Sequence, residues 1–382
     1  NNDLLNQIRN KYLNVITDID LFDKYHNQKS KIIGVTGTNG KTTFVNLLNK
    51  FLELEGFKTK ACGNIGESPL SIVDDDYEYI IIELSSYQLH HTKNLRLDYG
   101  IILNIASDHL DWHGSWNLYV ESKMKIFENQ DNKCFAIICV DDRYCEKIAK
   151  NFNKKFKSQL IRISTQKKID DGIYLKEQGE KIAIVNNLNQ SKILIDKKKL
   201  KFTKVNHNFQ NLLASYVCHF LLKRNDEAFL KLVYQLKNLE HRLEFITKIK
   251  NISIFNDSKA TNINSAKNAI KSLSNIYWIL GGRKKKGGIN GIESNLNKIV
   301  RAYTYGESGE EFNEFLKKKK IKSYKFLALE LALEKALKDG FKENREINLL
   351  FSPACSSFDQ FKNYEHRGRC FKKHLKKVLK NE

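Results

Sequence analysis

The sequence predicts an α/β protein with two domains: a larger central domain built on a parallel sheet, and a smaller, doubly wound (Rossmann-like) domain after it. Three observations predict this fold class. Short apolar runs alternate with amphipathic helical segments along most of the 382 residues, as in βαβ units. A glycine-bearing turn joins an apolar strand to a helix near the start of the series. A second set of strand and helix alternations follows residue 240, which predicts the second sheet.

The first element is the segment Lys31–Thr43, K-I-I-G-V-T-G-T-N-G-K-T-T, which has the order strand, turn and helix. Backbone N–H groups in such a turn point at a phosphate, and the helix N-terminus adds positive dipole. Lys41 is expected to reach the β- and γ-phosphates of a nucleotide, and the Thr42 hydroxyl a Mg²⁺ ion. The general P-loop pattern requires glycine where this chain has Val35, but the context still predicts a P-loop ATPase domain. The expected nucleotide-binding residues are Gly37, Thr38, Asn39, Gly40, Lys41, Thr42 and Thr43.

Two further strands carry polar side chains where they end. The run Tyr79–Leu84 has Glu83 near its carboxyl end, and Gly100–Ile105 leads into S-D-H-L-D-W-H-G-S, which contains His109. In open α/β sheets, ligands gather at the carboxyl ends of the strands. We therefore expect Glu83 to bind Mg²⁺ rather than to pair with a neighbouring cation, and His109 to take a metal or phosphate role.

The remaining elements complete the two domains. A helix around Lys123 and a strand over 134–142 follow, and residues 151–205 form a Lys-rich insertion of short strands. A helix over 206–222 ends the first series, and four more strands near 252, 276, 300 and 347 alternate with helices. On its own residues alone, Lys123 would be a solvated lysine. The expected organisation is a short segment at 1–30, a central ATP-binding domain at 31–240 and a C-terminal domain at 241–382.

Composition limits the class of protein. The net charge is +21, but the lysines are widely spread, so a solvated surface is favoured over a nucleic-acid partner, although an anionic nucleotide substrate would benefit from the field. No apolar run approaches 18 residues, so no membrane span is expected. The seven cysteines form no C-x-x-C pair, which indicates reduced thiols in a cytoplasm and neither a disulfide framework nor a zinc site.

Seven segments in order resemble the Mur ligase family, the ATP-dependent amide-forming enzymes of peptidoglycan precursor synthesis. They are G-V-T-G-T-N-G-K-T-T, G-N-I-G, E-L-S-S-Y-Q, N-I-A-S-D-H-L-D-W-H-G-S, H-N-F-Q-N, N-D-S-K-A-T-N and S-P-A-C-S-S-F-D-Q-F-K-N-Y-E-H-R-G. The last, Ser352–Gly368, is similar to the D-glutamate-adding branch of the family. The resemblance implies a ligase that adds D-glutamate to UDP-N-acetylmuramoyl-L-alanine through an acyl phosphate. Residues 1–30 resemble only the last helix and linker of the family's N-terminal UDP-binding domain.

The resemblance also implies roles for individual residues. It implies two Mg²⁺ ions, one held by Thr42 and Glu83 and one by His109 with Lys123 in carbamylated form. Carbamylation would turn that lysine into an anionic metal ligand. The implied catalytic residues are Lys41, His109, Lys123 and Lys259. The implied nucleotide contacts are Asn211, Arg242 and Asp257; the acceptor contacts are Asn64, Ser85 and Gln88; and the D-glutamate contacts are Thr261, Lys285, Ser357, Phe358 and Tyr364, with Lys284 or Lys286 as alternatives to Lys285.

Other interpretations stay open at this point. Ser85 and Gln88 could be ordinary polar ends of a strand, Asn211 could cap its helix, and Ser357 could form a turn. The chain could instead be a folate polyglutamate ligase of the same superfamily, or a nucleotide-binding module without turnover. A steep salt dependence of binding would be needed to support a nucleic-acid partner. A monomer is expected.

Overall fold

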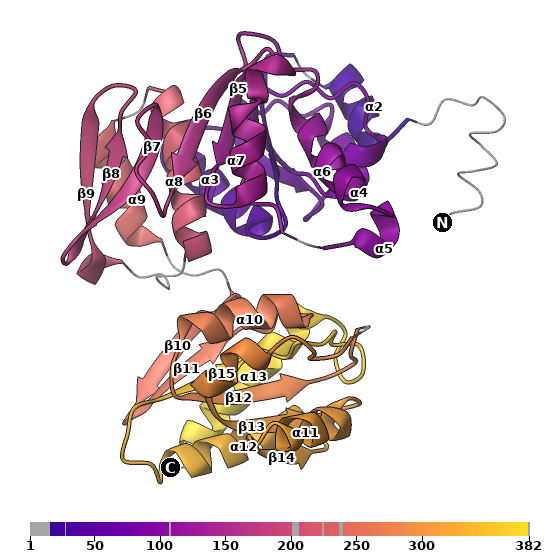
Figure 1. Cartoon of the computed structure of the whole chain (residues 1–382), viewed down its shortest axis with the longest axis vertical. Helices are drawn as coiled ribbons and strands as arrows, with labels where there is room; N and C mark the ends of the chain where they lie inside the picture. Colours follow the sequence, from indigo (N-terminus) through magenta and orange to yellow (C-terminus); the bar gives the residue numbers. More distant parts are fainter. Residues whose placement is uncertain are drawn as a thin grey trace, which may run out of the picture. The chain divides into compact units, whose positions relative to one another are not determined.

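The computed structural model describes residues 16–26, 28–106, 108–200, 206–223, 225–236, 240–285 and 287–380. The chain divides into two compact units, one ending at Leu236 and one described from Glu240 onward. Each unit has its own sheet, whose strands run from indigo to magenta-rose in the first unit and from salmon to orange in the second (Figure 1). Residues 1–15 of the segment expected at 1–30 lie outside the described residues. Within the described parts, none of the helices is long and apolar enough to cross a membrane.

The first unit is built on a nine-stranded sheet with the order β2-β3-β1-β4-β5-β6-β7-β8-β9. The strands from β2 to β7 are parallel, which confirms the predicted α/β class, and β8 and β9 continue the sheet antiparallel. The Lys-rich insertion is therefore an extension of the main sheet. The strands are β1 (Lys31–Thr36), β2 (Thr59–Gly63), β3 (Tyr79–Glu83), β4 (Tyr99–Ile102), β5 (Phe135–Cys139), β6 (Gln159–Ser164), β7 (Gly172–Gln178), β8 (Lys181–Asn186) and β9 (Ser191–Asp196).

The helices of this unit cover the parallel strands. The two central strands β1 and β4 are buried along almost their whole length, as strands are when helices cover both faces of a sheet. The helices are α2 (Asp18–Tyr25), α3 (Lys41–Leu54), α4 (Ser86–His91), α5 (Leu110–His113), α6 (Trp116–Met124), α7 (Arg143–Lys150), α8 (Asn206–Leu221) and α9 (Asp226–Gln235). Short 3₁₀ turns are η1 (Pro69–Ile72), η2 (Lys125–Phe127), η3 (Phe152–Lys154) and η4 (Lys197–Lys199).

Helix α3 forms where the sequence predicts a helix after the glycine turn. Phe44, Leu48 and Phe51 recur at helical spacing and are buried. Gly56 follows the helix with a φ of 89°, the left-handed conformation that commonly ends helices. Because β1 leads directly into α3 and lies between β3 and β4, the turn between them sits at the carboxyl edge of three adjacent strands.

The second unit has a six-stranded sheet with the order β10-β11-β15-β12-β13-β14. The four predicted strands are present, and the structure adds β10, which pairs antiparallel with β11, and β14 at the other edge. Both added strands carry lysines and exposed positions, so they lack the apolar runs that marked the other four. The strands are β10 (Glu244–Ile249), β11 (Ile252–Asn256), β12 (Ile276–Gly281), β13 (Ile299–Tyr305), β14 (Lys322–Phe326) and β15 (Ile347–Phe351).

Helices pack on this second sheet to close its core. One cluster of buried side chains joins strand residues such as Ile279 and Phe351 to Leu333 and to Phe371, whose ring stacks on that of Phe351 with centroids 4.5 Å apart. The helices are α10 (Ile263–Ser272), α11 (Gly309–Lys318), α12 (Leu329–Gly340) and α13 (Tyr364–Lys380), with the 3₁₀ segment η5 (Glu293–Lys298). All seven cysteines are free thiols, as predicted.

Candidate active site

The phosphate loop begins α3 with a glycine in a conformation that other residues rarely adopt. Gly40 is the N-cap, with a φ of 90° and no side-chain cap. A Cβ atom at this position would lie 3.0 Å from Oδ1 of Asn211. The first N–H groups of a helix have no partner inside the helix, so this turn presents donors and the positive end of the helix dipole. The loop therefore has the chemistry of an anion site.

Two N–H groups of the loop are already used by the chain itself. The N–H of Thr38 donates to the backbone oxygen of Asn104 (2.9 Å), and the N–H of Asn39 donates to Oδ1 of Asn104 (2.9 Å). The expectation that the N–H groups throughout the turn point at a phosphate is therefore wrong for these two. The sequence did not single out Asn104, because its partner lies 65 residues away along the chain.

The side chains of the loop are also held in place. Nζ of Lys41 donates to the backbone oxygens of Gly37 (2.8 Å) and Thr38 (3.2 Å). The ammonium is therefore held against the phosphate loop by hydrogen bonds. The Thr38 hydroxyl accepts from the N–H of Ala106 (2.9 Å) and lies 2.9 Å from the hydroxyl of Tyr119. Thr42 is buried in the first turn of α3.

Lys123 is the most unusual lysine of the unit, because it is only 2% exposed. Its Nζ donates to the backbone oxygen of Gly37 (3.0 Å) and lies 4.8 Å from the ring centroid of Tyr119. Burial, together with the charge of Lys41, holds the pKa of Lys123 well below its usual value. The interpretation of this residue as a solvated lysine is wrong. The structure instead brings a weakly basic amine beside the phosphate loop.

Glu83 lies at the carboxyl end of β3, paired in register with Val35 of β1, and is 3% exposed. One carboxylate oxygen, Oε1, accepts from the side-chain amide of Asn64 (3.0 Å). The other oxygen, Oε2, is buried without a hydrogen-bond partner in the described structure. A buried carboxylate oxygen without a donor is costly, and a cation would satisfy it. This orphaned oxygen is the observation of the structure that fits a Mg²⁺ ion.

No preformed cluster of three or more His, Cys, Asp or Glu side chains that could hold a metal exists among the described residues. Mg²⁺ does not need one, because it is usually bound by one or two carboxylates with phosphate oxygens and water. Glu83 and the Thr42 hydroxyl therefore fit such an ion when a nucleotide is bound. The chemistry that this ion supplies is neutralisation of phosphate charge.

The structure places His109 differently. It has a φ of 53°, its side chain is 45% exposed, and its Nε2 lies 3.4 Å from Oδ2 of Asp108. Its ring lies 4.9 Å from that of Tyr87 on α4. Within the described residues, no hydrogen bond joins His109 to Glu83 or to Lys123. The sequence thus places it at the correct edge of the sheet, but the structure does not bring it into contact with those two residues.

Ser85 and Gln88 form a capping box at the start of α4. The N–H of Gln88 donates to Oγ of Ser85 (3.3 Å), and Oε1 of Gln88 accepts from the N–H of Ser85 (3.0 Å). The S-x-x-Q spacing would have predicted this from the sequence. Both residues therefore have a structural role, and their contact with an acceptor substrate stays a prediction.

Asn211 does not cap its helix, because it lies in the interior of α8. Its side chain is 1% exposed, and neither amide atom has a hydrogen-bond partner in the described structure. Its position beside Gly40 puts an unsatisfied amide against the phosphate loop. A ligand at this loop would find both a donor and an acceptor there.

In the second unit, Asp257 lies just beyond β11 and is buried. Its Oδ1 accepts from the N–H of Leu243 (3.0 Å), and its Oδ2 accepts from the hydroxyl of Ser352 (2.7 Å). Burial raises the pKa of Asp257 to about 7, although these two hydrogen bonds and the charge of Arg242 oppose the rise. The carboxyl therefore titrates near neutral pH, which is common at functional sites.

Most of the residues expected to bind D-glutamate lie in the segments that follow β11, β12 and β15, and Tyr364 begins α13. Nζ of Lys259 lies 5.0 Å from the ring centroid of Tyr364. Ser357 is buried, whereas Phe358 is 63% exposed. Thr261 follows Lys259, and its N–H donates to the backbone oxygen of that lysine (2.8 Å).

The three candidate lysines of the G-G-R-K-K-K-G-G loop are not equivalent. Lys284 forms an ion pair with Glu311. Lys285 is exposed, and Lys286 lies outside the described residues. Of these two lysines, Lys285 forms no ion pair within the described residues, so it is the better candidate.

The sequence analysis missed Arg367, which is fully buried on α13. Its guanidinium donates to the backbone oxygens of Ser258 (2.8 Å) and Cys355 (3.0 Å). These bonds tie the segment that carries Asp257 and Lys259 to the segment that carries Ser357. No pattern in the sequence singles it out, because α13 carries another arginine and several lysines.

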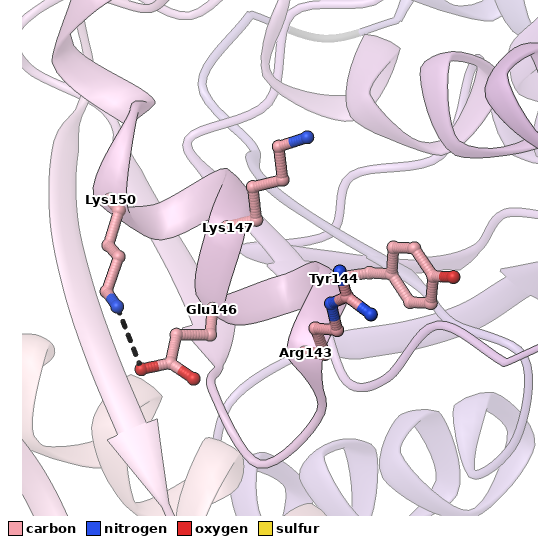
Figure 2. Close-up of a pocket in the computed structure, with 5 residues that line it drawn as sticks. All are labelled: Arg143, Tyr144, Glu146, Lys147 and Lys150. Atoms are coloured by element: carbon pink, nitrogen blue, oxygen red, sulfur yellow. Dashed lines mark ion pairs between the residues drawn. The ribbon is translucent and has the colours of Figure 1, made fainter.

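A pocket of about 330 Å³ lies along α7, and Figure 2 shows Tyr144 and Arg143 at one end of it and the Glu146–Lys150 ion pair (3.4 Å) at the other. Lys147 completes the lining. None of these residues belongs to the site that the sequence predicts, so the pocket does not identify the active site.

Comparison with known proteins gives consistent results for both units. Residues 35–219 match the model of the Mur ligase middle domain, and residues 241–353 match that of the Mur ligase glutamate ligase domain. The UDP-N-acetylmuramoylalanine--D-glutamate ligase of Rickettsia prowazekii (strain Madrid E) is 37% identical over 359 residues, which cover 94% of this chain and 78% of that protein. The protein of the same name from Caulobacter sp. (strain K31) is 34% identical over 370 residues, covering 94% and 77%.

Solved structures agree on the fold. The MurF ligase from Thermotoga maritima in complex with ADP superposes with a TM-score of 0.67 at 20% identity, covering 95% of this chain and 86% of that one. The UDP-N-acetylmuramate-alanine ligase MurC from Thermotoga maritima gives a TM-score of 0.63 at 17% identity, covering 94% and 78%. At these identities the likeness concerns the fold alone.

Proposed function

This chain belongs to the Mur ligase family, as its sequence motifs predict, and we propose that it is an ATP-dependent ligase that adds D-glutamate to UDP-N-acetylmuramoyl-L-alanine in peptidoglycan precursor synthesis. The observation that carries the proposal is the 37% identity, across 94% of this chain, to a relative with that name. The products of the reaction besides the amide are ADP and phosphate. We place the reaction in a bacterial cytoplasm and expect a monomer.

The reaction has two steps. The acceptor carboxylate attacks the γ-phosphorus of ATP, so that a P–O bond forms, the bond to ADP breaks, and an acyl phosphate results. The amine of D-glutamate then attacks the acyl carbon, and the tetrahedral intermediate loses phosphate and a proton. Phosphoryl transfer needs positioning and charge neutralisation. The N-terminus of α3 and the ammonium of Lys41 would provide these to the phosphates.

We propose that Thr42 and Glu83 hold one Mg²⁺ ion and that His109 and a carbamylated Lys123 hold another. Carbamylation requires a neutral amine, and the burial that lowers the pKa of Lys123 favours this state. The carbamate would supply negative charge where the unmodified lysine has none. His109 is the weakest member of this set, because its side chain is 45% exposed.

We divide the chain into a central ATP-binding domain at 31–240 and a C-terminal amino-acid-binding domain at 241–382, which follow a short segment at 1–30. The remaining residues of the site are assigned by substrate. Asn211, Arg242 and Asp257 would contact the nucleotide, and Asn64, Ser85 and Gln88 the acceptor. Lys259, Thr261, Lys285, Ser357, Phe358 and Tyr364 would contact D-glutamate or the reacting groups.

Phosphate release from ATP tests the proposal. The chain is supplied with Mg²⁺ and UDP-N-acetylmuramoyl-L-alanine, and D-glutamate is compared with L-glutamate and with a diamino acid. Release that depends on D-glutamate is expected, and Lys41→Ala should abolish it. Release with L-glutamate or the diamino acid at the same rate would contradict the proposed specificity. ATP binding without any release would favour a nucleotide-binding module.

A further inference from the structure

The phosphate loop is held by a chain of three side chains outside it. We propose that Asn104 is a positioning residue that sets the conformation of the phosphate loop, and that Gln210 and Asp141 fix the orientation of its amide. The inference rests on the proposed function only in that the loop binds a nucleotide. It concerns residues to which the proposed function assigns no substrate, nucleotide or metal.

The amide of Asn104 pairs with both polar groups of one loop residue. Its Oδ1 accepts from the N–H of Asn39 (2.9 Å), and its Nδ2 donates to the backbone oxygen of Asn39 (3.1 Å). The backbone oxygen of Asn104 also accepts from the N–H of Thr38 (2.9 Å). Three hydrogen bonds from one residue therefore fix two consecutive residues of the loop.

This pairing needs an amide in one orientation. An N–H group requires an acceptor and a C=O group requires a donor, so a rotated amide would lose both bonds to Asn39. The side chain of Gln210 on α8 determines which orientation is stable. Its Oε1 accepts from Nδ2 of Asn104 (3.3 Å), and its own Nε2 donates to Oδ2 of Asp141 (3.1 Å).

Asp141 anchors this chain of side chains beyond the end of β5. It accepts from the hydroxyl of Ser164 (2.6 Å) and from the hydroxyl of Thr165 (2.6 Å). A carboxylate is an acceptor only, so it fixes the amide of Gln210 with Nε2 toward it and Oε1 toward Asn104. The order of donors and acceptors is thus determined from Asp141 to the loop.

The arrangement separates the N–H groups of the loop into two sets. Those of Thr38 and Asn39 are tied to Asn104, whereas those of Gly40 and of the first turn of α3 remain at the helix N-terminus. Because the hydrogen bonds from Asn104 already hold the loop in this conformation, nucleotide binding does not have to order the loop. Such preorganisation improves affinity by lowering the cost of binding.

These hydrogen-bonded side chains also link two parts of the nucleotide site. Gln210 and Asn211 are neighbours on α8, and Asn211 lies against Gly40. A shift of α8 would therefore move the amide beside Gly40 and the support of Asn104 together. The hydrogen bonds through Gln210 and Asn104 thus couple the position of α8 to the conformation of the phosphate loop.

Binding of Mg²⁺·ADP to the full chain, measured by calorimetry, tests the inference without requiring turnover. Asn104→Leu keeps the size of the side chain and removes both bonds to Asn39. At roughly a fivefold effect for each hydrogen bond, ADP should bind at least about tenfold more weakly. Gln210→Met, which does not touch the loop, should weaken binding by about fivefold. In turnover, the KM for ATP should rise while kcat at saturating ATP stays nearly constant.

The double variant gives the sharpest outcome. If Gln210 acts through Asn104, Gln210→Met should have almost no effect on ADP binding in the Asn104→Leu background. If the effects of the two substitutions on the free energy of ADP binding simply add, Gln210 does not act through Asn104 and the inference fails. Unchanged ADP binding by either single variant would also contradict it. Gln210→Met keeps the inference testable if Asn104→Leu does not fold.

A matched control comes from Gln130, a buried glutamine of the same unit whose Nε2 donates to the backbone oxygens of Leu97 (3.0 Å) and Phe135 (3.0 Å). Gln130→Met should lower the melting temperature without changing ADP binding, and an equal loss of ADP affinity would overturn the positioning role. If the unaltered chain does not bind ADP, the nucleotide site of the proposed function fails, and this inference fails with it. If the Asn104 and Gln210 variants bind ADP as tightly as the unaltered chain, the positioning inference fails but the proposed function stands.

Discussion

The buried carboxyl of Asp257 makes the stability of the second unit dependent on pH, and Asp257→Asn should remove that dependence. The pKa of Asp257 is raised from 3.8 to about 7 because burial disfavours its charged form. Below pH 3.8 the carboxyl is protonated in both the folded and the unfolded chain. As the pH rises toward 7, the unfolded chain loses this proton and the folded chain keeps it, so the free energy of unfolding falls.

The size of the effect follows from the shift. A pKa difference of about three units corresponds to about 4 kcal/mol, at about 1.4 kcal/mol per pH unit between 4 and 7. An asparagine can accept from the N–H of Leu243 and donate to the Ser352 hydroxyl, so it retains both contacts without a charge. The difference in unfolding free energy between Asp257→Asn and the parent should therefore grow by about 4 kcal/mol from pH 4 to pH 7 and then stay constant.

Trp278 reports this transition. It is one of three tryptophans, it is buried in β12, and its Nε1 donates to the backbone oxygen of Ser352 (2.8 Å), the residue that contacts Asp257. The other two tryptophans, Trp112 and Trp116, lie in the first unit, so Trp112→Phe and Trp116→Phe provide a background in which fluorescence follows the second unit. Urea unfolding curves from pH 4 to pH 8 then give the free energy.

The control is the same substitution at a second buried carboxyl of that unit. Although burial opposes it, the hydrogen bonds from Lys335 and Tyr303 lower the pKa of Asp339. Its stabilisation is present above pH 3.8 and is lost only as the pH falls below that value. Asp339→Asn should thus destabilise the unit by a constant amount between pH 5 and pH 8. Parallel curves for Asp257→Asn and the parent from pH 4 to pH 7 would refute the reasoning.

Three further predictions concern the chemistry. Lys123→Ala should lose turnover and regain part of it with acetate or propionate, which can replace the carbamate; turnover at the parent rate without an additive would exclude that role. Glu83→Gln should raise the Mg²⁺ concentration for half-maximal activity by at least about tenfold, because an amide is a poorer ligand, and an unchanged Mg²⁺ titration would remove Glu83 from the metal site. Lys285→Ala should raise the KM for D-glutamate by about tenfold through loss of a charge-assisted bond. Lys284→Ala should change it little, because Lys284 pairs with Glu311; equal effects of the two substitutions would contradict this assignment.

The parts of the site predicted from the sequence are those that one short segment determines. The strand, the glycine turn and the helix of residues 31–54 are contiguous, so their periodicity and glycines predicted the phosphate loop. Glu83 was placed correctly because parallel strands bring their carboxyl ends to one edge. The S-x-x-Q capping box of Ser85 and Gln88 is equally local and could have been recognised.

The parts that could not be predicted depend on distant contacts. Asn104 was one polar residue among several after β4, and only its contact with Asn39 gives it a role. The burial of Lys123 depends on its packing against Gly37 and Tyr119, which no spacing in the sequence indicates. Edge strands such as β14 lack an apolar pattern because one side of them needs no burial.

The position of β15 in the second sheet has a consequence for how the chain is made. This strand lies between β11 and β12, which are both synthesised much earlier, and Ile252 pairs with Ile347. Until β15 leaves the ribosome, β11 and β12 each present an unpaired edge in a nascent chain. In the first unit, by contrast, the last of the described strands ends at residue 196. We expect it to fold during translation, whereas the second unit can complete its sheet only when β15 arrives, and a chain interrupted before residue 347 would expose two edges prone to aggregation.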